Sequence, residues 1–254
     1  MNQTSPSHVI SCSGKPVQRA ALIVIVFLLF FPTLVSGQSF RNTGGYREYD
    51  IVKETQQRAE KGDAEAQYNL GVMYARGEGV DQDNAEALNW YNKAAKQGVA
   101  EAQVSLGVAY NTGVGVAKNG TEALQWFRIA AGQGNAFAQF SLGMAHHEGT
   151  GGLPKNDTEA VHWYCKAAEQ GFALAQSNLG FMYANGQGIP RNYELAHMWL
   201  TIAASQQSVA LQELQPLDSV IKQVELRMRP DKITSAQRLA IRCLESKYKN
   251  CDHN

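Results

Sequence analysis

Four glycines recur at a nearly constant interval, and this interval limits what the chain can fold into. They lie 36, 36 and 37 residues apart in a chain of 254 residues, at Gly71, Gly107, Gly143 and Gly180. Three other residue types repeat in step with them, at Gln67, Gln103, Gln139 and Gln176, at Leu70, Leu106, Leu142 and Leu179, and at Trp90, Trp126, Trp163 and Trp199. A fixed period of this length is the signature of stacked structural repeats.

Each copy predicts two helices separated by a turn rich in glycine. In the first copy, Ala66, Leu70, Gly71 and Tyr74 form one helical stripe within residues 64–76. Glycines follow this stripe, and glycine accepts the left-handed conformation that ends a helix. The second helix begins at an acid or amide with glutamate three residues later, which is the pattern of a capping box: Asp83 with Glu86, Asn119 with Glu122, and Asn156 with Glu159.

The repeated glycine lies inside the first helix of each copy, where it costs about 1 kcal/mol relative to alanine. Because the same cost recurs four times, packing must offset it, and we expect two helix backbones to approach closely at each glycine. The chain is therefore predicted to be all-α, an α-α superhelix in the form of a right-handed helical-repeat solenoid.

The segments "AEAQYNLGVMYARGEGV" (64–80) and "EALNWYNKAAKQG" (86–98) resemble the Sel-one-like repeat, a relative of the tetratricopeptide repeat. The resemblance covers residues 64–207 in four copies, 64–99, 100–135, 136–172 and 173–207. It implies a tetratricopeptide-like solenoid with a lead-in and N-terminal capping helix in residues 38–63 and C-terminal capping helices in residues 208–254. Two features depart from the family pattern. Arg229 stands where a capping threonine is usual, and in copy four Leu195 replaces the capping-box glutamate and Gln207 the terminal glycine.

The first 37 residues differ in kind from the repeats. Lys15 and Arg19 precede an apolar run over residues 20–35, and Val35 and Gly37 occupy the −3 and −1 positions of a signal-peptidase site. The run is shorter than the roughly 20 residues that span a bilayer, and Pro32 interrupts it. We therefore expect a cleaved signal peptide over residues 1–37 and a periplasmic or secreted protein. An uncleaved signal anchor in the inner membrane is the alternative, and only this alternative implies a membrane partner.

Charge and ligand-type side chains restrict the expected partners. Lysines plus arginines and aspartates plus glutamates number 23 each, and no basic run occurs, so nucleic acid is not an expected partner. His146 takes the repeat position of Tyr74, and His162 lies on the second helix of its copy, so we expect no metal site. The sequence indicates no cofactor.

The four cysteines predict one disulfide. Cys243 and Cys251 lie eight residues apart across the end of the last helix, and in an oxidising compartment this spacing permits a bond between them. Two free thiols are the alternative. Cys165 occupies an interior repeat position and is expected to be a lone packed thiol, while Cys12 lies in the leader.

Two classes of function are compatible with these patterns. The first is a non-catalytic exported scaffold that binds another protein or a peptide. The second is a weak hydrolase or penicillin-binding protein acting on cell-wall or β-lactam-like substrates, because some secreted relatives have been described as penicillin-binding and Ser246 and Lys249 form an S-x-x-K motif. The companion motifs S-D-N and K-T-G are absent, so the scaffold is the favoured hypothesis.

The resemblance also implies where a partner would bind. In a tetratricopeptide-type stack the first helix of each pair lines the concave face, and the positions around the repeat glycine point into it. The expected partner-binding residues are Tyr68, Val72, Arg76, Val104, Val108, Phe137, Phe140, Met144, His147, Leu174 and Phe181. The face becomes more apolar along the stack, and exposed apolar side chains of this kind mark interaction sites. The alternative is that these side chains pack against a neighbouring helix or the C-terminal cap.

Overall fold

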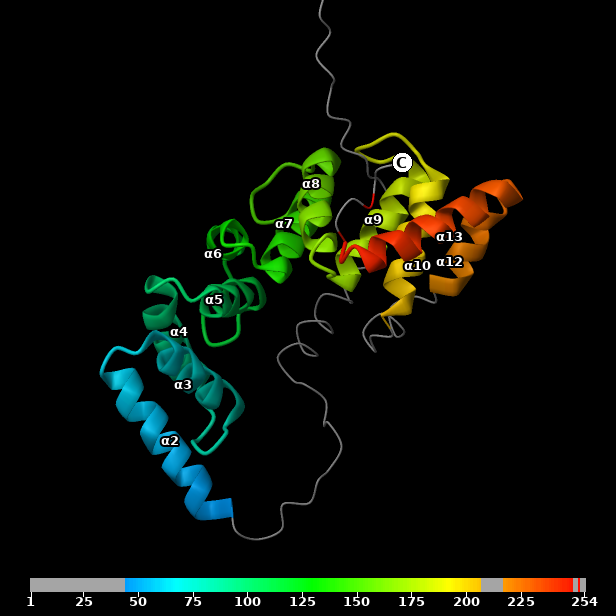
Figure 1. The fold of residues 1–254 in the computed structure, drawn as a ribbon. Coiled ribbons are helices and arrows are strands. Elements are labelled where there is room, and N and C mark those ends of the chain that lie inside the picture. Colours follow the sequence, from blue (N-terminus) through cyan, green and yellow to red (C-terminus); the bar gives the residue numbers. More distant parts are fainter. Residues whose placement is uncertain (1–43, 207–216, 249–250, 252–254) are drawn as a thin grey trace, which may run out of the picture. The chain divides into compact units, whose positions relative to one another are not determined.

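The computed structural model describes residues 44–206, 217–248 and 251. Every helix or strand that it assigns in these ranges is an α-helix (Figure 1). Four helix pairs correspond to the four copies: α3 (Ala64–Arg76) with α4 (Asn84–Lys96), α5 (Ala100–Thr112) with α6 (Gly120–Gly132), α7 (Ala136–Glu148) with α8 (Asp157–Ala168), and α9 (Ala173–Asn185) with α10 (Tyr193–Ser205). The capping helices are α2 (Gly44–Glu60), α12 (Leu217–Glu225) and α13 (Pro230–Glu245). The predicted all-α helical-repeat fold is confirmed.

The described residues form two compact units. The N-terminal unit contains residues 44–138, and the C-terminal unit contains the described residues from Gln139 onward. Within the described ranges no helix is long and apolar enough to cross a membrane. The apolar run over residues 20–35, on which the predicted leader rests, lies outside these ranges.

The repeat glycine leaves room for a large side chain of the second helix, in addition to the close approach of the two helix backbones. A Cβ on Gly71 would lie 2.6 Å from Tyr91 Cδ1 and 3.2 Å from the Ala87 carbonyl oxygen. A Cβ on each of the other three glycines would also lie 2.6 Å from a side chain of the second helix of its copy, namely Phe127, Tyr164 or Leu200. The expectation of a close approach holds, and it needs refinement because an aromatic ring or leucine is the nearest group in every copy.

In the three copies with a predicted capping box, only half of the box forms at the start of the second helix. The Asp83 carboxylate accepts hydrogen bonds from the backbone of Ala85 and Glu86, and Asn192 does the same for Glu194 and Leu195. In a complete capping box the N-cap backbone N–H donates to the glutamate side chain. Here it donates to a backbone carbonyl near the end of the first helix. This bond joins the same positions in all four copies, Asp83 to Tyr74, Asn119 to Tyr110, Asn156 to His146 and Asn192 to Tyr183. The glutamate is therefore dispensable, which explains why Leu195 is tolerated.

The recurring glutamines join the two helices of each copy. In every copy the first-helix glutamine accepts through Oε1 from the Nε2 of a glutamine at the end of the second helix, at 2.7–2.8 Å, in the pairs Gln67–Gln97, Gln103–Gln133, Gln139–Gln170 and Gln176–Gln206. Three of the first-helix glutamines also donate to a carbonyl eight residues upstream, Gln67 to Ala59, Gln103 to Ala95 and Gln176 to Ala168. These amides are buried, so their hydrogen bonds also avoid the penalty of an unpaired polar group. Copy four keeps its pair although Gln207 replaces the terminal glycine.

The C-terminal helices are tied to copy four by polar contacts. The buried His197 on α10 contacts Glu225 on α12 at 2.9 Å, and Lys232 on α13 donates to Glu194 at 2.9 Å. Arg229, the departure noted in the sequence, is the N-cap of α13 and makes no side-chain capping bond there.

Candidate functional site

The eleven predicted partner-binding residues all lie on the first helices α3, α5, α7 and α9, but they differ in exposure. Arg76 is exposed, and five others are partly exposed: Tyr68, Val72, Val104, Phe137 and Phe181. The remaining five are buried: Val108, Phe140, Met144, His147 and Leu174. The expectation that these five side chains are exposed is wrong. Their role in binding a partner stays a prediction, and their small exposed area does not support it.

In the N-terminal unit the predicted face carries tyrosines with polar neighbours. Tyr68 packs on Tyr91 with ring centroids 5.8 Å apart and planes tilted by 35°. Both hydroxyls interact with the Ser105 side chain on α5. Burial raises the pKa of Tyr68, and the nearby Glu101 carboxylate raises it further. In this part of the face the Tyr68 ring therefore has polar neighbours and is partly exposed to solvent.

In the C-terminal unit the equivalent ring is enclosed. Phe140 packs on Tyr164 at 5.8 Å and also on Phe172 at 5.2 Å, and it is only 4% exposed. Phe172 is the N-cap residue of α9 and makes no side-chain capping bond. The packing alternative therefore holds for Phe140, because a second aromatic side chain covers it.

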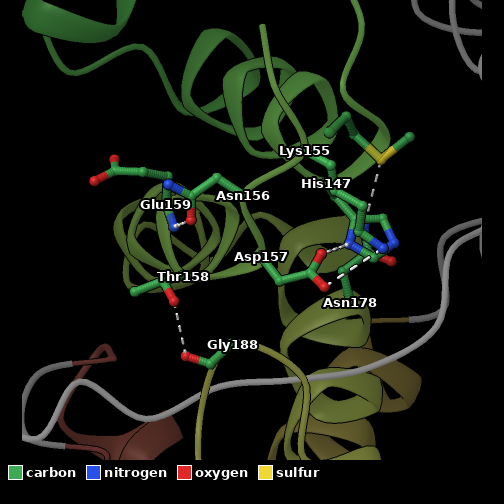
Figure 2. Close-up of polar contacts among 9 residues, drawn as sticks. His147, Lys155, Asn156, Asp157, Thr158, Glu159, Asn178 and Gly188 are labelled. Atoms are coloured by element: carbon green, nitrogen blue, oxygen red, sulfur yellow. Dashed lines mark hydrogen bonds and ion pairs between the residues drawn. The ribbon is translucent and has the colours of Figure 1, made fainter.

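His147 and Met144 are held by polar contacts within the same unit, as Figure 2 shows for His147. His147 Nδ1 lies 2.7 Å from Asp157 Oδ1 at the start of α8, and Lys155 Nζ lies 3.5 Å from the other oxygen of this carboxylate. Asn178 Nδ2 on α9 donates to Met144 Sδ at 3.8 Å. These contacts explain why two residues expected on a free face are about 95% buried.

Asp157, the partner of His147, is not among the residues predicted from the sequence. Copy three is the only copy in which these two repeat positions hold histidine and aspartate. The equivalent pairs are Ala75 with Asn84, Asn111 with Gly120, and Ala184 with Tyr193. The joint occurrence of histidine and aspartate at these two positions in copy three alone was the sequence signal for this pair.

Metal-binding side chains do not gather into a site in the described part of the chain. No group of three or more histidine, cysteine, aspartate or glutamate side chains comes close enough there to hold a metal ion. The Ser246 hydroxyl of the S-x-x-K motif donates to the Cys243 carbonyl at 2.9 Å. Lys249 lies outside the described residues.

The two tail cysteines are adjacent. The structure pairs Cys243 with Cys251, and their Cα atoms lie 4.7 Å apart, within the range that a disulfide spans. Both are buried, and Cys165 on α8 is half-buried. Whether the pair is oxidised in the cell stays a prediction, since it depends on the compartment.

Comparisons with known proteins agree with the repeat geometry. The sequence model described as the Sel1 repeat matches residues 64–99, 100–135, 136–172 and 173–208. A solved Sel1 repeat protein from Oxalobacter formigenes is 32% identical, with a TM-score of 0.64 over 76% of each chain. A protective antigen present in uropathogenic Escherichia coli strains, which displays an SLR fold, is 40% identical with a TM-score of 0.60. That match covers 64% of this chain and 37% of the antigen. A comparison with curated proteins gives no match.

Proposed function

Because the chain belongs to the Sel1 repeat family, we propose that it is an exported scaffold that binds a protein or peptide partner through the first helices of its repeats, without catalysis. The observation that carries this proposal is that apolar and aromatic side chains stay partly exposed on the first helix of each copy. Tyr68 and Val72 lie on α3, Val104 on α5, Phe137 on α7 and Phe181 on α9. Surface of this composition is typical of protein interfaces.

The proposal places the partner mainly on α3 and α5. There, Tyr68 and Val104 are accessible and Arg76 extends into solvent, where its guanidinium lies 3.4 Å from Glu78. An exposed pair of this kind contributes little to stability, so Arg76 can exchange its carboxylate for one on a partner at low cost. Arginine and tyrosine are also the residue types that most often dominate binding energy at interfaces.

A capture experiment with matched variants tests the binding face. The tagged chain is used to retain partners from the exported fraction, and the double variant Arg76→Glu with Val104→Asp is compared with Arg128→Glu with Val114→Asp. Both doubles change charge equally, and both lie in the N-terminal unit, but Arg128 and Val114 are exposed positions off the first helices. We expect the first double to lose the partner and the second to keep it, with similar helicity by circular dichroism. Equal retention by both would reject the proposed face.

Export is proposed from the leader and from the tail cysteines. Mass spectrometry of the exported protein is expected to find Gln38 at the N-terminus. Thiol labelling without reductant is expected to leave Cys243 and Cys251 unmodified. An intact Met1 in the membrane fraction would indicate an anchored protein, and repeats found in the cytoplasm would reject export altogether.

A further inference from the structure

Two arginines in the C-terminal unit converge on one tyrosine ring. Arg191 lies in the turn before α10, and its guanidinium carbon is 5.4 Å from the centroid of Tyr193. Arg227 follows α12, lies 5.9 Å from the same centroid, and donates through Nη1 to the Tyr193 hydroxyl at 3.3 Å. Segments about 35 residues apart in the sequence thus bring two positive charges to one aromatic side chain. We call Arg191, Tyr193 and Arg227 the arginine pair site.

The charge at this site is not neutralised within the described part of the chain. Neither arginine of the site forms an ion pair with a described carboxylate, whereas nearby Arg229 pairs with Asp231 and Lys232 pairs with Glu194. Two like charges near one ring repel each other, although the ring attracts each cation. A carboxylate bound to either guanidinium group would lessen the repulsion. Both side chains are exposed, so an anion from solution can reach them.

The same repeat positions in copy three hold Lys155 and Asp157, where copy four holds Arg191 and Tyr193. The Lys155 ammonium lies 3.5 Å from the Asp157 carboxylate. In copy four the position of this carboxylate is taken by the Tyr193 ring, which Arg191 faces at 5.4 Å. The cation of copy four therefore lacks the carboxylate that its counterpart in copy three has.

We propose that the arginine pair site binds the carboxylates of an acidic segment in the protein partner. The inference rests on the proposed function for the existence of a protein partner, and it adds the chemistry that the partner must present. Guanidinium groups donate in a planar fork that matches a carboxylate, and such charge-assisted bonds are about twice as strong as neutral ones. The site lies on the turn before α10 and at the end of α12, so it is a contact separate from the predicted face on the first helices.

Binding of a labelled acidic peptide tests the site directly. The full chain is titrated into a fluorescein-labelled peptide of alternating glutamate and glycine, with the glutamine–glycine peptide as the ligand control. The test variant is Arg191→Gln with Arg227→Gln. The matched variant is Arg238→Gln with Arg242→Gln, which removes the same charge from exposed positions on α13 of the same unit. Fluorescence anisotropy gives the affinities, and thermal unfolding shows that each variant is folded.

We expect the wild type to prefer the glutamate peptide and the test variant to bind it at least about tenfold more weakly, as expected for the loss of two charge-assisted hydrogen bonds. The matched variant should stay close to the wild type. Equal weakening in both variants would overturn the proposal, because it would indicate general charge attraction. Binding to phosphatidylglycerol vesicles without binding to the glutamate peptide would also overturn it, in favour of a membrane surface.

The failure of this proposal can be told apart from failure of the proposed function. If the test variant still captures the cellular partner while Arg76→Glu with Val104→Asp does not, the arginine pair site is wrong and the scaffold function stands. If the arginine pair binds the peptide but no partner depends on the first helices, the proposed face is wrong and the anion site stands.

Discussion

Tyr68 with Tyr91 in the N-terminal unit and Phe140 with Tyr164 in the C-terminal unit occupy the same repeat positions with nearly the same geometry. The ring centroids are 5.8 Å apart in both pairs, and the tilt is 35° in one and 38° in the other. Tyr68 remains partly exposed, whereas Phe140 is buried beneath Phe172. The repeat therefore sets the position of the ring, and the residue that precedes the following first helix decides whether the ring is available to a partner.

The largest difference between the two regions is expected from removing the first ring of each pair. Phe140→Ala should lower the free energy of unfolding by about 3–5 kcal/mol, because it opens a cavity between Tyr164 and Phe172. Tyr68→Ala should cost clearly less, since part of its ring already contacts water. Urea unfolding followed by circular dichroism measures both. Phe140→Leu is the control and should recover most of the loss, and an equal cost at both sites would contradict the comparison.

The glycines beneath the two pairs are expected to behave alike. Gly71→Ala and Gly143→Ala should each destabilise by about 1–3 kcal/mol, because the new methyl would lie 2.6 Å from the ring of Tyr91 or Tyr164. Gly132, at the end of α6, has no atom within 4 Å of its missing Cβ. Gly132→Ala should therefore be neutral or stabilising by up to about 1 kcal/mol. If Gly71→Ala raised the unfolding midpoint as Gly132→Ala does, the ring contact would not explain the glycine.

The smallest effect is expected just above pH 10, where the second ring of each pair begins to lower stability. Burial raises the pKa of Tyr91 and of Tyr164 above the ordinary phenol value of about 10. Above pH 10 the unfolded chain releases these protons while the folded chain keeps them. Stability is therefore complete below pH 10 and falls as the pH rises, by up to about 1.4 kcal/mol per pH unit for each tyrosine.

The Tyr91→Phe and Tyr164→Phe variants test this effect separately in the two units. Each should lose part of the alkaline slope, as measured by urea unfolding at a series of pH values. Each should also lose about 1 kcal/mol at neutral pH, because Tyr91 interacts with Ser105 and Tyr164 with Asn178 through their hydroxyls. An unchanged slope in both variants would show that the phenols are not protected from ionisation.

Periodicity was enough to predict the fold and the helices that carry the candidate face. The spacing of Gly71 and its equivalents indicated paired helices, because a position that excludes every side chain recurs only where the same packing recurs. The N-caps such as Asp83 were readable for the same reason, since an N-cap acts on its own helix. The return bond of the capping box was not readable, because the N–H of Asp83 could pair with either Glu86 or Tyr74, and only the three-dimensional turn selects Tyr74.

The exposure of side chains on the candidate face depends on residues that are not part of the repeated pattern. Phe172 stands at the N-cap position of a first helix, where Asp63 accepts a hydrogen bond from its own helix and Val99 makes no such bond. The Phe172 ring instead covers Phe140, so the last residue of copy three determines the burial of a residue on the first helix of the same copy. His147 likewise found its carboxylate ten residues away across a turn. Such pairs follow from the path of the turn and from side-chain size, and neither is set by the period of 36 residues.

The glutamine pairs join the two helices of each repeat, and the further bonds of three first-helix members reach no farther than the preceding copy or capping helix. Both amides of a pair come from the same copy, 30 or 31 residues apart, and the carbonyl that Gln67, Gln103 or Gln176 also binds lies eight residues upstream. A gene that loses or duplicates one whole copy in frame therefore keeps every such bond, because no partner is shared across more than one junction. Unequal recombination could thus change the number of copies, and with it the length of the proposed binding face, without new mutations to restore the glutamine bonds.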